Sequence, residues 1–486
     1  ISLGLVGSEM CIRDRAQVVQ LLQYVWIVTS DVSLPTALGH TTAALERLYR
    51  VHTAATLDAL AEAWWLSGAV NALAAPTPSL LTRLAGSEQV VCAALCDSIS
   101  SRRRNGSRGV LVNDLLLLRF LDAYAQTLSS DALAQVWPVV ALLAKGVQTG
   151  AGRAHVFLTL RLVTTMGVRL APTRVFEDAR ARRDVQDTFV RLGEQVLSLY
   201  ARSLDVTSVA RDSDSASVAS EREDIANDAA APTPVQVVQF FAASALPALQ
   251  SLAIETDRAM SLCTSLAYYV LAPGFKSRAR AMDIEPLVLD LLTQMSTLTG
   301  TSKTWRAVVW DTFLDAKFFA LSPAMGKRWA PIVAALMSAE RDRLVDVIGR
   351  MAPAPSTNLF TSREADVIAR VVGVRRLAYT VWTAQPHTFL AQLPLIQEKV
   401  VDILRAQSAE LVQAEVYLCM RVLLCRFSSQ HLAGFWPILL TELMRIFGKA
   451  RTELPEPRTD ALHLLFSVSK LCLLYTSDAA DDMQCV

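Results

Sequence analysis

Several features are missing from this 486-residue sequence, and each absence excludes a class of protein. No run of about 18 uncharged apolar residues occurs, and the most apolar region, 54–75, contains Asp58 and Glu62, so we expect a buried helix there and no membrane span. The formal net charge is only +1, which argues against a broad nucleic-acid-binding surface. No stretch alternates apolar and polar residues for long enough to indicate a β-sheet.

Cysteine is also scarce, with eight residues that show no regular pairing distances. Such usage is typical of reduced, mostly buried thiols in a cytosolic protein. Cys92 and Cys96 are one helical turn apart, and Cys419 and Cys425 lie near His431, but no second ligand pair stands at the spacing of a zinc site. We therefore expect structural thiols, with a metal cluster as the alternative.

Residue patterns for catalysis are weak throughout. The glycines in 146–152 fit neither a dinucleotide loop nor a P-loop. The serines at 428–429 and His431 lack a nucleophile-elbow motif, so a helix N-cap is the preferred role for one serine. Asp311 and Asp315 are one turn apart but have aromatic neighbours, which indicates a packed helix edge. We predict no enzymatic activity, no metal and no cofactor.

Helical patterns fill the rest of the chain, which is 52% hydrophobic and 19% charged. The clearest case is 415–443, which is predicted to form two helices separated by a short polar break. The first is apolar on most of its surface, as in a helix held between neighbours. The second, within a predicted helix at 429–449, has apolar residues spaced as in a core-facing stripe, at Ile438, Leu439, Leu443, Ile446 and Phe447.

The chain divides by composition into five segments. Residues 1–15 and 473–486 are similar to translated sequencing-adapter sequence and are expected to be non-native. Residues 16–202 and 235–472 are predicted helical arrays. The segment 203–234 is rich in serine and acidic residues, so we predict a disordered insert, with a phosphorylation-regulated switch as the alternative.

A weak internal repeat suggests the architecture. Trp137-Pro138, Trp329-Ala330-Pro331 and Trp436-Pro437 each precede an apolar helical run. We therefore predict an all-α, HEAT-like solenoid of stacked antiparallel helix pairs, with a series of unrelated helical bundles as the alternative.

Two clusters of basic residues are candidate lipid-binding sites, because clustered Lys and Arg side chains bind anionic headgroups. A solvated loop is the default interpretation of each cluster, and lipid binding is the functional alternative. The candidates are Arg102, Arg103, Arg104 and Arg108 in one loop, and Lys276, Arg278 and Arg280 in another.

The second half of the sequence resembles the C-terminal region of the Dopey family. The resemblance rests on TWRAVVWDTFLDAKFF (304–319), NLFTSREADVIARVVGVRRLAY (358–379), IQEKVVDILR (396–405) and VYLCMRVLLCRFSSQHLAGFWPILLTEL (416–443). Ser429 departs from the family pattern, in which we expect a proline at the start of the helix. The signature residues, taken either as core or as a partner-binding surface, are Trp305, Arg306, Trp310, Arg375, Arg376, Arg421, Arg426, His431, Trp436, Pro437 and Glu442.

The resemblance implies a non-enzymatic scaffold on the cytoplasmic face of Golgi, trans-Golgi network and endosome membranes. It implies as partners a large relative of the Arf exchange factors and a phospholipid flippase, and for some members kinesin and phosphoinositides. A homodimer is a further possibility, and nucleic acid is not expected. Another helical-repeat adaptor, such as a nuclear transport receptor or a vesicle-coat subunit, is the alternative.

Overall fold

The computed structural model describes residues 21–23, 35–67, 77–105, 114–201, 204, 232–275, 281–351, 363–406, 408–452, 455–456 and 459–476. The chain forms two compact units, Ile1–Gly274 and Phe275–Val486. Every regular element within the described ranges is a helix, which confirms the all-α prediction.

The first unit contains longer helices up to Tyr200 and mostly short ones after it. Its α-helices are α2 (Pro35–Val51), α3 (Thr53–Ser67), α5 (Thr77–Ala85), α6 (Glu88–Asn105), α7 (Asp114–Thr127), α8 (Ser130–Gln148), α9 (Arg153–Leu170), α10 (Ala179–Tyr200), α13 (Pro234–Phe240), α14 (Leu246–Ser251), α15 (Thr256–Leu266) and α16 (Ala272–Gly274). A 3₁₀ turn, η2 (Arg174–Glu177), precedes α10, and π-helical turns η3 (Phe241–Ala245) and η4 (Ala267–Leu271) follow α13 and α15.

The second unit has the same all-helical character. Its α-helices are α17 (Pro286–Thr297), α18 (Ser302–Leu314), α19 (Pro323–Ala339), α20 (Asp342–Gly349), α21 (Arg363–Thr383), α22 (Leu393–Arg405), α23 (Glu410–Arg426), α24 (Ser429–Leu432), α25 (Trp436–Thr452) and α26 (Asp460–Thr476). The 3₁₀ turns are η5 (Ala281–Asp283), η6 (Phe318–Ala320), η7 (Leu390–Gln392) and η8 (Ala433–Phe435).

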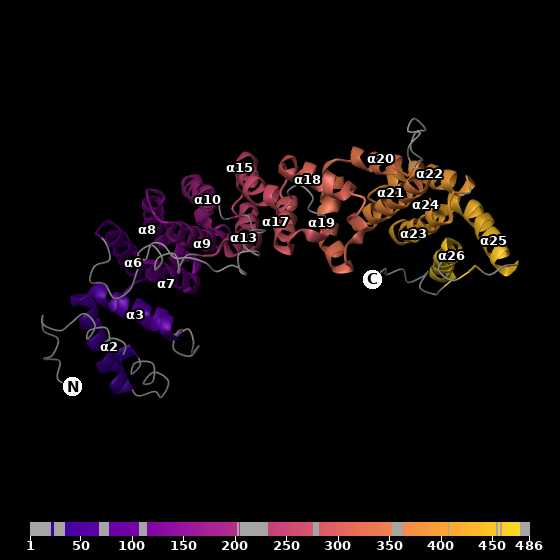
Figure 1. Ribbon diagram of the computed structural model, residues 1–486. Coiled ribbons are helices and arrows are strands. Elements are labelled where there is room, and N and C mark those ends of the chain that lie inside the picture. Colours follow the sequence, from indigo (N-terminus) through magenta and orange to yellow (C-terminus); the bar gives the residue numbers. More distant parts are fainter. Residues whose placement is uncertain are drawn as a thin grey trace, which may run out of the picture. The chain divides into compact units, whose positions relative to one another are not determined.

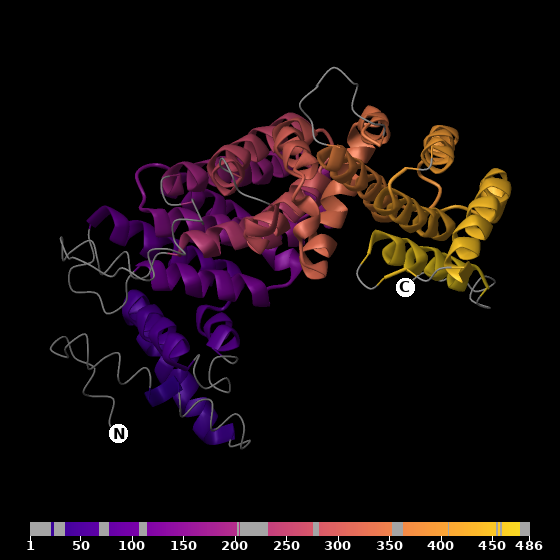
Figure 2. The ribbon, with the colours of Figure 1, turned by 45° about the vertical axis from the view of Figure 1, so that its right-hand side comes forward.

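Helices pack mainly on those that precede or follow them closely in sequence. In the first unit α9 contacts α7, α8 and α10; in the second, α19 contacts α17, α18 and α21, while α23 lies between α21 and α26. Colour accordingly changes gradually along each unit in Figures 1 and 2. Stacked helix pairs of this kind are the defining feature of a helical-repeat solenoid, as the sequence predicted.

The boundary between the units differs from the one that composition suggests. Helices α13 to α16 follow the serine-rich segment, yet they pack with the first unit, where α15 contacts α10 and α14 contacts α9. The side chain of Gln186 in α10 donates a hydrogen bond of 2.8 Å to the carbonyl of Leu252. Most of 203–234 lies outside the described residues, so its disorder stays a prediction; so does the non-native origin proposed for 1–15 and 473–486.

The three tryptophan–proline segments share a serine N-cap, which the sequence predicted only at 428–429. Ser129, Ser322 and Ser428 are the N-cap residues of α8, α19 and α24, and a proline follows each of them by nine residues. Pro138 and Pro331 lie inside continuous helices. Before Pro437 the helix is instead broken by the 3₁₀ turn η8, so the predicted single helix 429–449 is in fact three elements.

Burial in the two helices predicted within 415–443 and 429–449 follows the prediction for the first and only in part for the second. Val416, Cys419 and Leu423 of α23 are fully buried, as expected for a helix held between neighbours. In α25, Leu439, Leu443 and Ile446 are buried, whereas Phe447, which was placed in the same stripe, is 39% exposed. Leu440 and Met444 are also exposed, at 54% and 77%, so α25 presents an apolar edge to solvent.

A glycine in α21 provides a test of this packing. A Cβ atom at Gly373 would lie 2.5 Å from the carbonyl oxygen of Arg350, at the end of α20. Although alanine normally favours a helix over glycine, we expect Gly373→Ala to destabilise the protein by about 1–3 kcal/mol in chemical denaturation, because the two backbones must separate.

Gly448→Ala in α25 is the matched control. No atom lies within 4 Å of the added Cβ there, so we expect a stabilisation of about 0.5–1 kcal/mol. Equal effects of the two changes would show that α20 and α21 do not make this close contact.

Candidate functional site: a cationic groove in the second unit

Aromatic residues from two of the family-like segments, 304–319 and 358–379, pack with Trp329 in the core of the second unit. The ring of Phe318 packs edge-to-face against three other rings. The distances between ring centroids are 5.0 Å to Phe313, 5.5 Å to Trp329 and 5.7 Å to Tyr379. These residues come from η6, α18, α19 and α21. Packing inside the unit is therefore sufficient to explain the aromatic residues of these segments, and no binding partner is needed to explain them.

The signature residues of α18 are also used internally. Trp305 is 2% exposed and Trp310 is 7% exposed. The guanidinium of Arg343 lies over the Trp310 ring at 4.5 Å. Arg306 pairs with Glu340, to which Arg343 also donates a hydrogen bond of 2.9 Å. The hydrogen bond from Arg343 lowers the pKa of the Glu340 carboxyl, with a further contribution from Arg306.

Two adjacent arginines connect α21 to its neighbours. Arg375 donates two hydrogen bonds to the carboxylate of Glu415 in α23, one of them 3.1 Å long. Arg376 is 4% exposed and donates to the carbonyls of Phe313 at 2.9 Å, Leu314 at 3.0 Å and Asp315 at 3.3 Å. These carbonyls belong to the end of α18, where a helix leaves its last acceptors unsatisfied. Arg376 therefore acts as a C-cap supplied by another helix.

The expectation of a basic loop at Arg102 is wrong. Arg102 lies in the last turns of α6, is 8% exposed and forms an ion pair with Asp58 of α3. Since its charge is neutralised inside the protein, it is not available to a lipid headgroup. Arg103 and Arg104 continue α6, but their side chains, together with Arg108, Lys276, Arg278 and Arg280, lie outside the described residues.

The cysteine pairs do not assemble a metal site. Cys92, Cys96 and Cys419 are buried, which confirms their expected structural role. Burial raises the pKa of the Cys92 thiol to about 12, so its thiolate is scarce at neutral pH. Across the described parts of the chain, no group of three or more His, Cys, Asp or Glu residues could hold a metal ion.

Ser428 and His431 do meet, but on an exposed turn. The Ser428 hydroxyl and the Nδ1 atom of His431 are 2.6 Å apart, and no carboxylate among the described residues orients the imidazole from its other side. Ser428 takes the predicted N-cap position, although its side chain bonds the imidazole and not the helix backbone. Asp311 and Asp315 are both exposed, and Asp315 follows α18 as its C-cap.

The remaining signature residues lie around α23 to α25. The His431 carbonyl accepts a hydrogen bond from Gln397 of α22 at 3.1 Å. Glu442 pairs with Arg445 at 2.7 Å within α25. Trp436 is half-buried and Pro437 is exposed at the start of α25.

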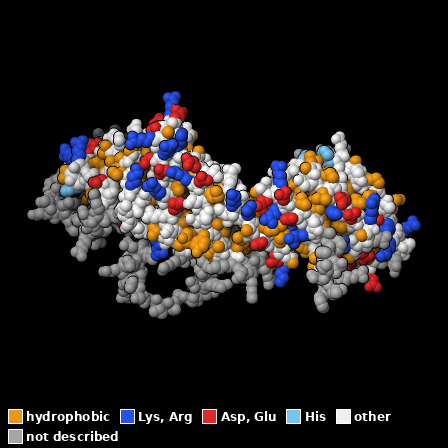
Figure 3. All heavy atoms as spheres, turned by 90° about the horizontal axis from the view of Figure 1, so that it is seen from above, with side chains coloured by type: hydrophobic (Ala, Val, Ile, Leu, Met, Phe, Trp, Pro, Cys, Tyr) orange, Lys and Arg blue, Asp and Glu red, His pale blue; other side chains and the backbone are white. Residues whose placement is uncertain are grey.

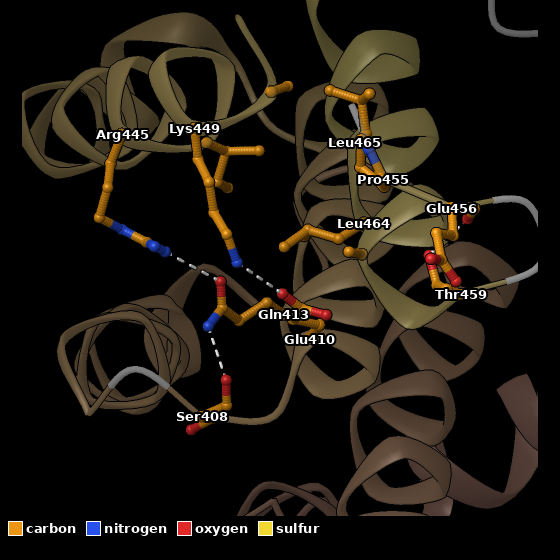
Figure 4. Close-up of a pocket in the computed structure, with 13 residues that line it drawn as sticks. Ser408, Glu410, Gln413, Arg445, Lys449, Pro455, Glu456, Thr459, Leu464 and Leu465 are labelled. Carbon is orange, nitrogen blue, oxygen red and sulfur yellow. Dashed lines mark hydrogen bonds and ion pairs between the residues drawn. The ribbon is translucent and has the colours of Figure 1, made fainter. Parts of the chain in front are cut away.

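Two hollows flank α23, and the first has balanced charges. It lies where α23, α25 and α26 meet (Figure 4). Lys449 lies 3.4 Å from Glu410, and Arg445 donates to the side chain of Gln413 at 3.2 Å, which in turn donates to the Ser408 carbonyl at 2.6 Å. The hollow thus has acidic as well as basic side chains, and these contacts occupy both of its cations.

The second hollow, which we call the cationic groove, is not balanced. It has a volume of about 590 Å³ and is lined from α21, α23 and α26 by Trp382, Leu418, Arg421, Val422, Cys425, Arg426, Lys470, Leu473 and Leu474. Three of these residues are cations and none is an acid. The Nε atoms of Arg421 and Arg426 are buried without a hydrogen-bond acceptor in the described structure.

The groove combines residues that the sequence singled out with others that it did not. Arg421 and Arg426 belong to the signature, whereas Trp382 and Lys470 come from helices far away in sequence. Leu418, Val422 and Cys425 follow the spacing of one helical face of α23, and this spacing is the only local signal for the groove.

The fold and these sites define a class of protein: an all-α helical-repeat protein in which the signature side chains serve mainly to join helices. A family model described as DOP1 C-terminal matches residues 120–484. The chain therefore belongs to this family, which is the Dopey family that its sequence resembles. The match starts at residue 120, within the first predicted helical array, and reaches through most of 473–486, the segment expected to be non-native.

Relatives occur in several animals. The chain is 26% identical to "Protein DOP1B" of Mus musculus over 374 residues, which are 71% of this chain and 15% of the mouse protein. It is 28% identical to "Protein DOP1 homolog" of Drosophila melanogaster over 357 residues, or 70% and 14% of the two chains. "Protein pad-1" of Caenorhabditis elegans is 30% identical over 174 residues, or 35% and 7%. The chain thus spans about 15% of the mouse relative's length, and no solved structure matches it.

Replacement of the buried arginine tests whether the signature is structural. We expect Arg376→Met to destabilise the second unit by about 2–4 kcal/mol, because three carbonyls at the end of α18 lose charged donors. Arg405→Met, at an exposed position in α22, is the control and should be close to neutral. Urea denaturation followed by circular dichroism measures both. An Arg376 variant as stable as the control would contradict a structural role.

Proposed function

We propose that this chain is the binding part of a non-enzymatic scaffold in membrane traffic between endosomes and the Golgi. The observation that carries the proposal is membership of the DOP1 C-terminal family over residues 120–484. The use of buried polar side chains is compatible with it, since Arg375, Arg376 and Glu415 are occupied in joining helices.

Binding by such a chain works through its surface. Stacked helix pairs expose one edge of each helix, so a partner can contact several pairs at once. On the face shown in Figure 3, Lys and Arg side chains alternate with Asp and Glu, and apolar atoms lie between them. A mixed surface of this type suits protein partners better than a polyanion.

The proposed location is the cytoplasmic face of Golgi, trans-Golgi network and endosome membranes, to which the protein would attach as a peripheral membrane protein. None of the described helices combines the length and the apolar character needed to cross a bilayer. The proposed partners are an Arf-exchange-factor-like scaffold and a phospholipid flippase. They are inferred from the family alone.

Proximity labelling of the complete protein in its host tests this function. We expect the labelled proteins to include Golgi and endosome membrane proteins, among them an Arf-exchange-factor relative and a flippase. A labelled set dominated by Ran and nuclear cargo, or by coat subunits, would assign the chain to another class of helical-repeat adaptor. Catalytic turnover of a phosphate or acyl substrate by the purified protein would refute the non-enzymatic role.

Anionic-lipid binding through basic residues is a separate part of the proposal. Charge reversal of Lys276, Arg278 and Arg280 to Glu should weaken binding of the chain to phosphatidylserine-containing liposomes, measured by flotation, by about a hundredfold or more, since the three clustered cations contribute roughly 1 kcal/mol each. Charge reversal of Lys303, Lys327 and Arg405, which changes the net charge equally elsewhere, is the control. Equal flotation of the two variants would exclude a specific role for the cluster.

A further inference from the structure

The cationic groove has an excess of positive charge that nothing in the described structure neutralises. Arg421 and Lys470 form no ion pair with any described residue, and no carboxylate lines the groove. Glu415 is the acid that interacts with Arg421, but both of its oxygens accept hydrogen bonds from Arg375. The adjacent hollow, where Lys449 faces Glu410, shows that charges elsewhere on α23 are paired.

Both arginines of the groove are incompletely satisfied, and Arg426 is held in place. Arg426 donates a hydrogen bond of 2.5 Å to the Trp382 carbonyl near the end of α21, which fixes the position of its guanidinium. Its Nε atom and that of Arg421 are shielded from solvent without an acceptor among the described residues. Burial also lowers the pKa of the Arg421 guanidinium, and an anion at this position would offset that cost. A buried donor without a partner is unfavourable, so binding of an acceptor here is favoured.

The walls of the groove are apolar. Leu418 and Val422 are half-buried on α23, and the indole of Trp382 is 39% exposed at the rim. A ligand that fits both the walls and the cations must carry an anionic group next to a bulky apolar one. About 590 Å³ is enough for a few side chains.

We propose that the cationic groove binds a short acidic segment of a partner protein, with carboxylates on Arg421, Arg426 and Lys470 and an apolar side chain against Trp382 and Val422. This inference deepens the proposed binding function and rests on it. A peptide is favoured over a bilayer, because the guanidiniums lie within a concavity between helices, whereas binding to a membrane surface uses cations on exposed loops. Arginine in a fixed position also matches the bidentate geometry of a carboxylate.

Selection of a random peptide library on the purified full chain tests the proposal. We expect enrichment of sequences that place Asp or Glu next to Leu, Phe or Trp. The selected peptides should bind about tenfold more weakly to the Arg421→Gln/Lys470→Gln variant, because two charged contacts to the peptide are lost. Arg426 is left unchanged in this variant because it also holds α21.

Lys303→Gln/Arg405→Gln is the matched control, since it removes the same charge at exposed positions outside the groove. It should bind the selected peptides as the parent chain does, and thermal unfolding should show that both variants are folded. Equal weakening by both variants, or no enrichment of acidic residues, would overturn the proposal.

Binding to vesicles distinguishes a peptide ligand of the groove from a lipid ligand. Flotation with phosphatidylcholine vesicles, with and without phosphatidylserine, should be the same for the parent chain and the groove variant. A loss of flotation in the groove variant alone would assign the groove to anionic lipid and refute the peptide. If proximity labelling still finds Golgi and endosome proteins while the groove variant binds peptides normally, the proposed function stands and only the groove assignment fails.

Discussion

The burial of helix faces that no single pair can cover alone is the constraint on which this structure depends. Helix α23 is buried on most of its surface because α21 and α26 pack on either side of it. Where a neighbour is missing, apolar residues stay exposed, as Leu440 and Met444 do on α25. Each helix thus owes its stability to the next, and the chain forms an array in each unit instead of one central core.

Polar side chains then fix how neighbouring helices meet. Arg375 joins α21 to α23, Arg376 caps α18, and Tyr379 donates a hydrogen bond of 2.6 Å to the carbonyl of Gly326 in α19. These buried contacts are costly to break, because each would leave charged or polar groups without partners in a low-dielectric interior. They explain why arginines and aromatic residues recur in segments that resemble the family. Because these side chains are used inside the protein, binding to a partner must involve other, exposed residues.

Periodicity was sufficient to predict the helices, the sandwiched position of α23 and the stacked-pair architecture, because these depend on local spacing of apolar residues. Periodicity did not predict features that are determined by contacts between segments distant in sequence. The sequence predicted Arg102 to lie in a basic loop, but the side chain is buried and hydrogen-bonded to Asp58, which lies 44 residues earlier. The packing of α13 to α16 with the first unit depends likewise on tertiary contacts. The cationic groove was predictable only at Arg421 and Arg426, since Trp382 and Lys470 reach it from other helices.

The central claim is that stability is local, with each helix pair supported by its immediate neighbours. Hydrogen exchange of the parent chain, measured segment by segment at increasing urea concentrations, tests it most directly. We expect separate opening transitions, with α18, α19, α21 and α23 the last to exchange because they share the buried aromatic and arginine contacts. A single transition in which all helices of both units lose protection together would contradict the account.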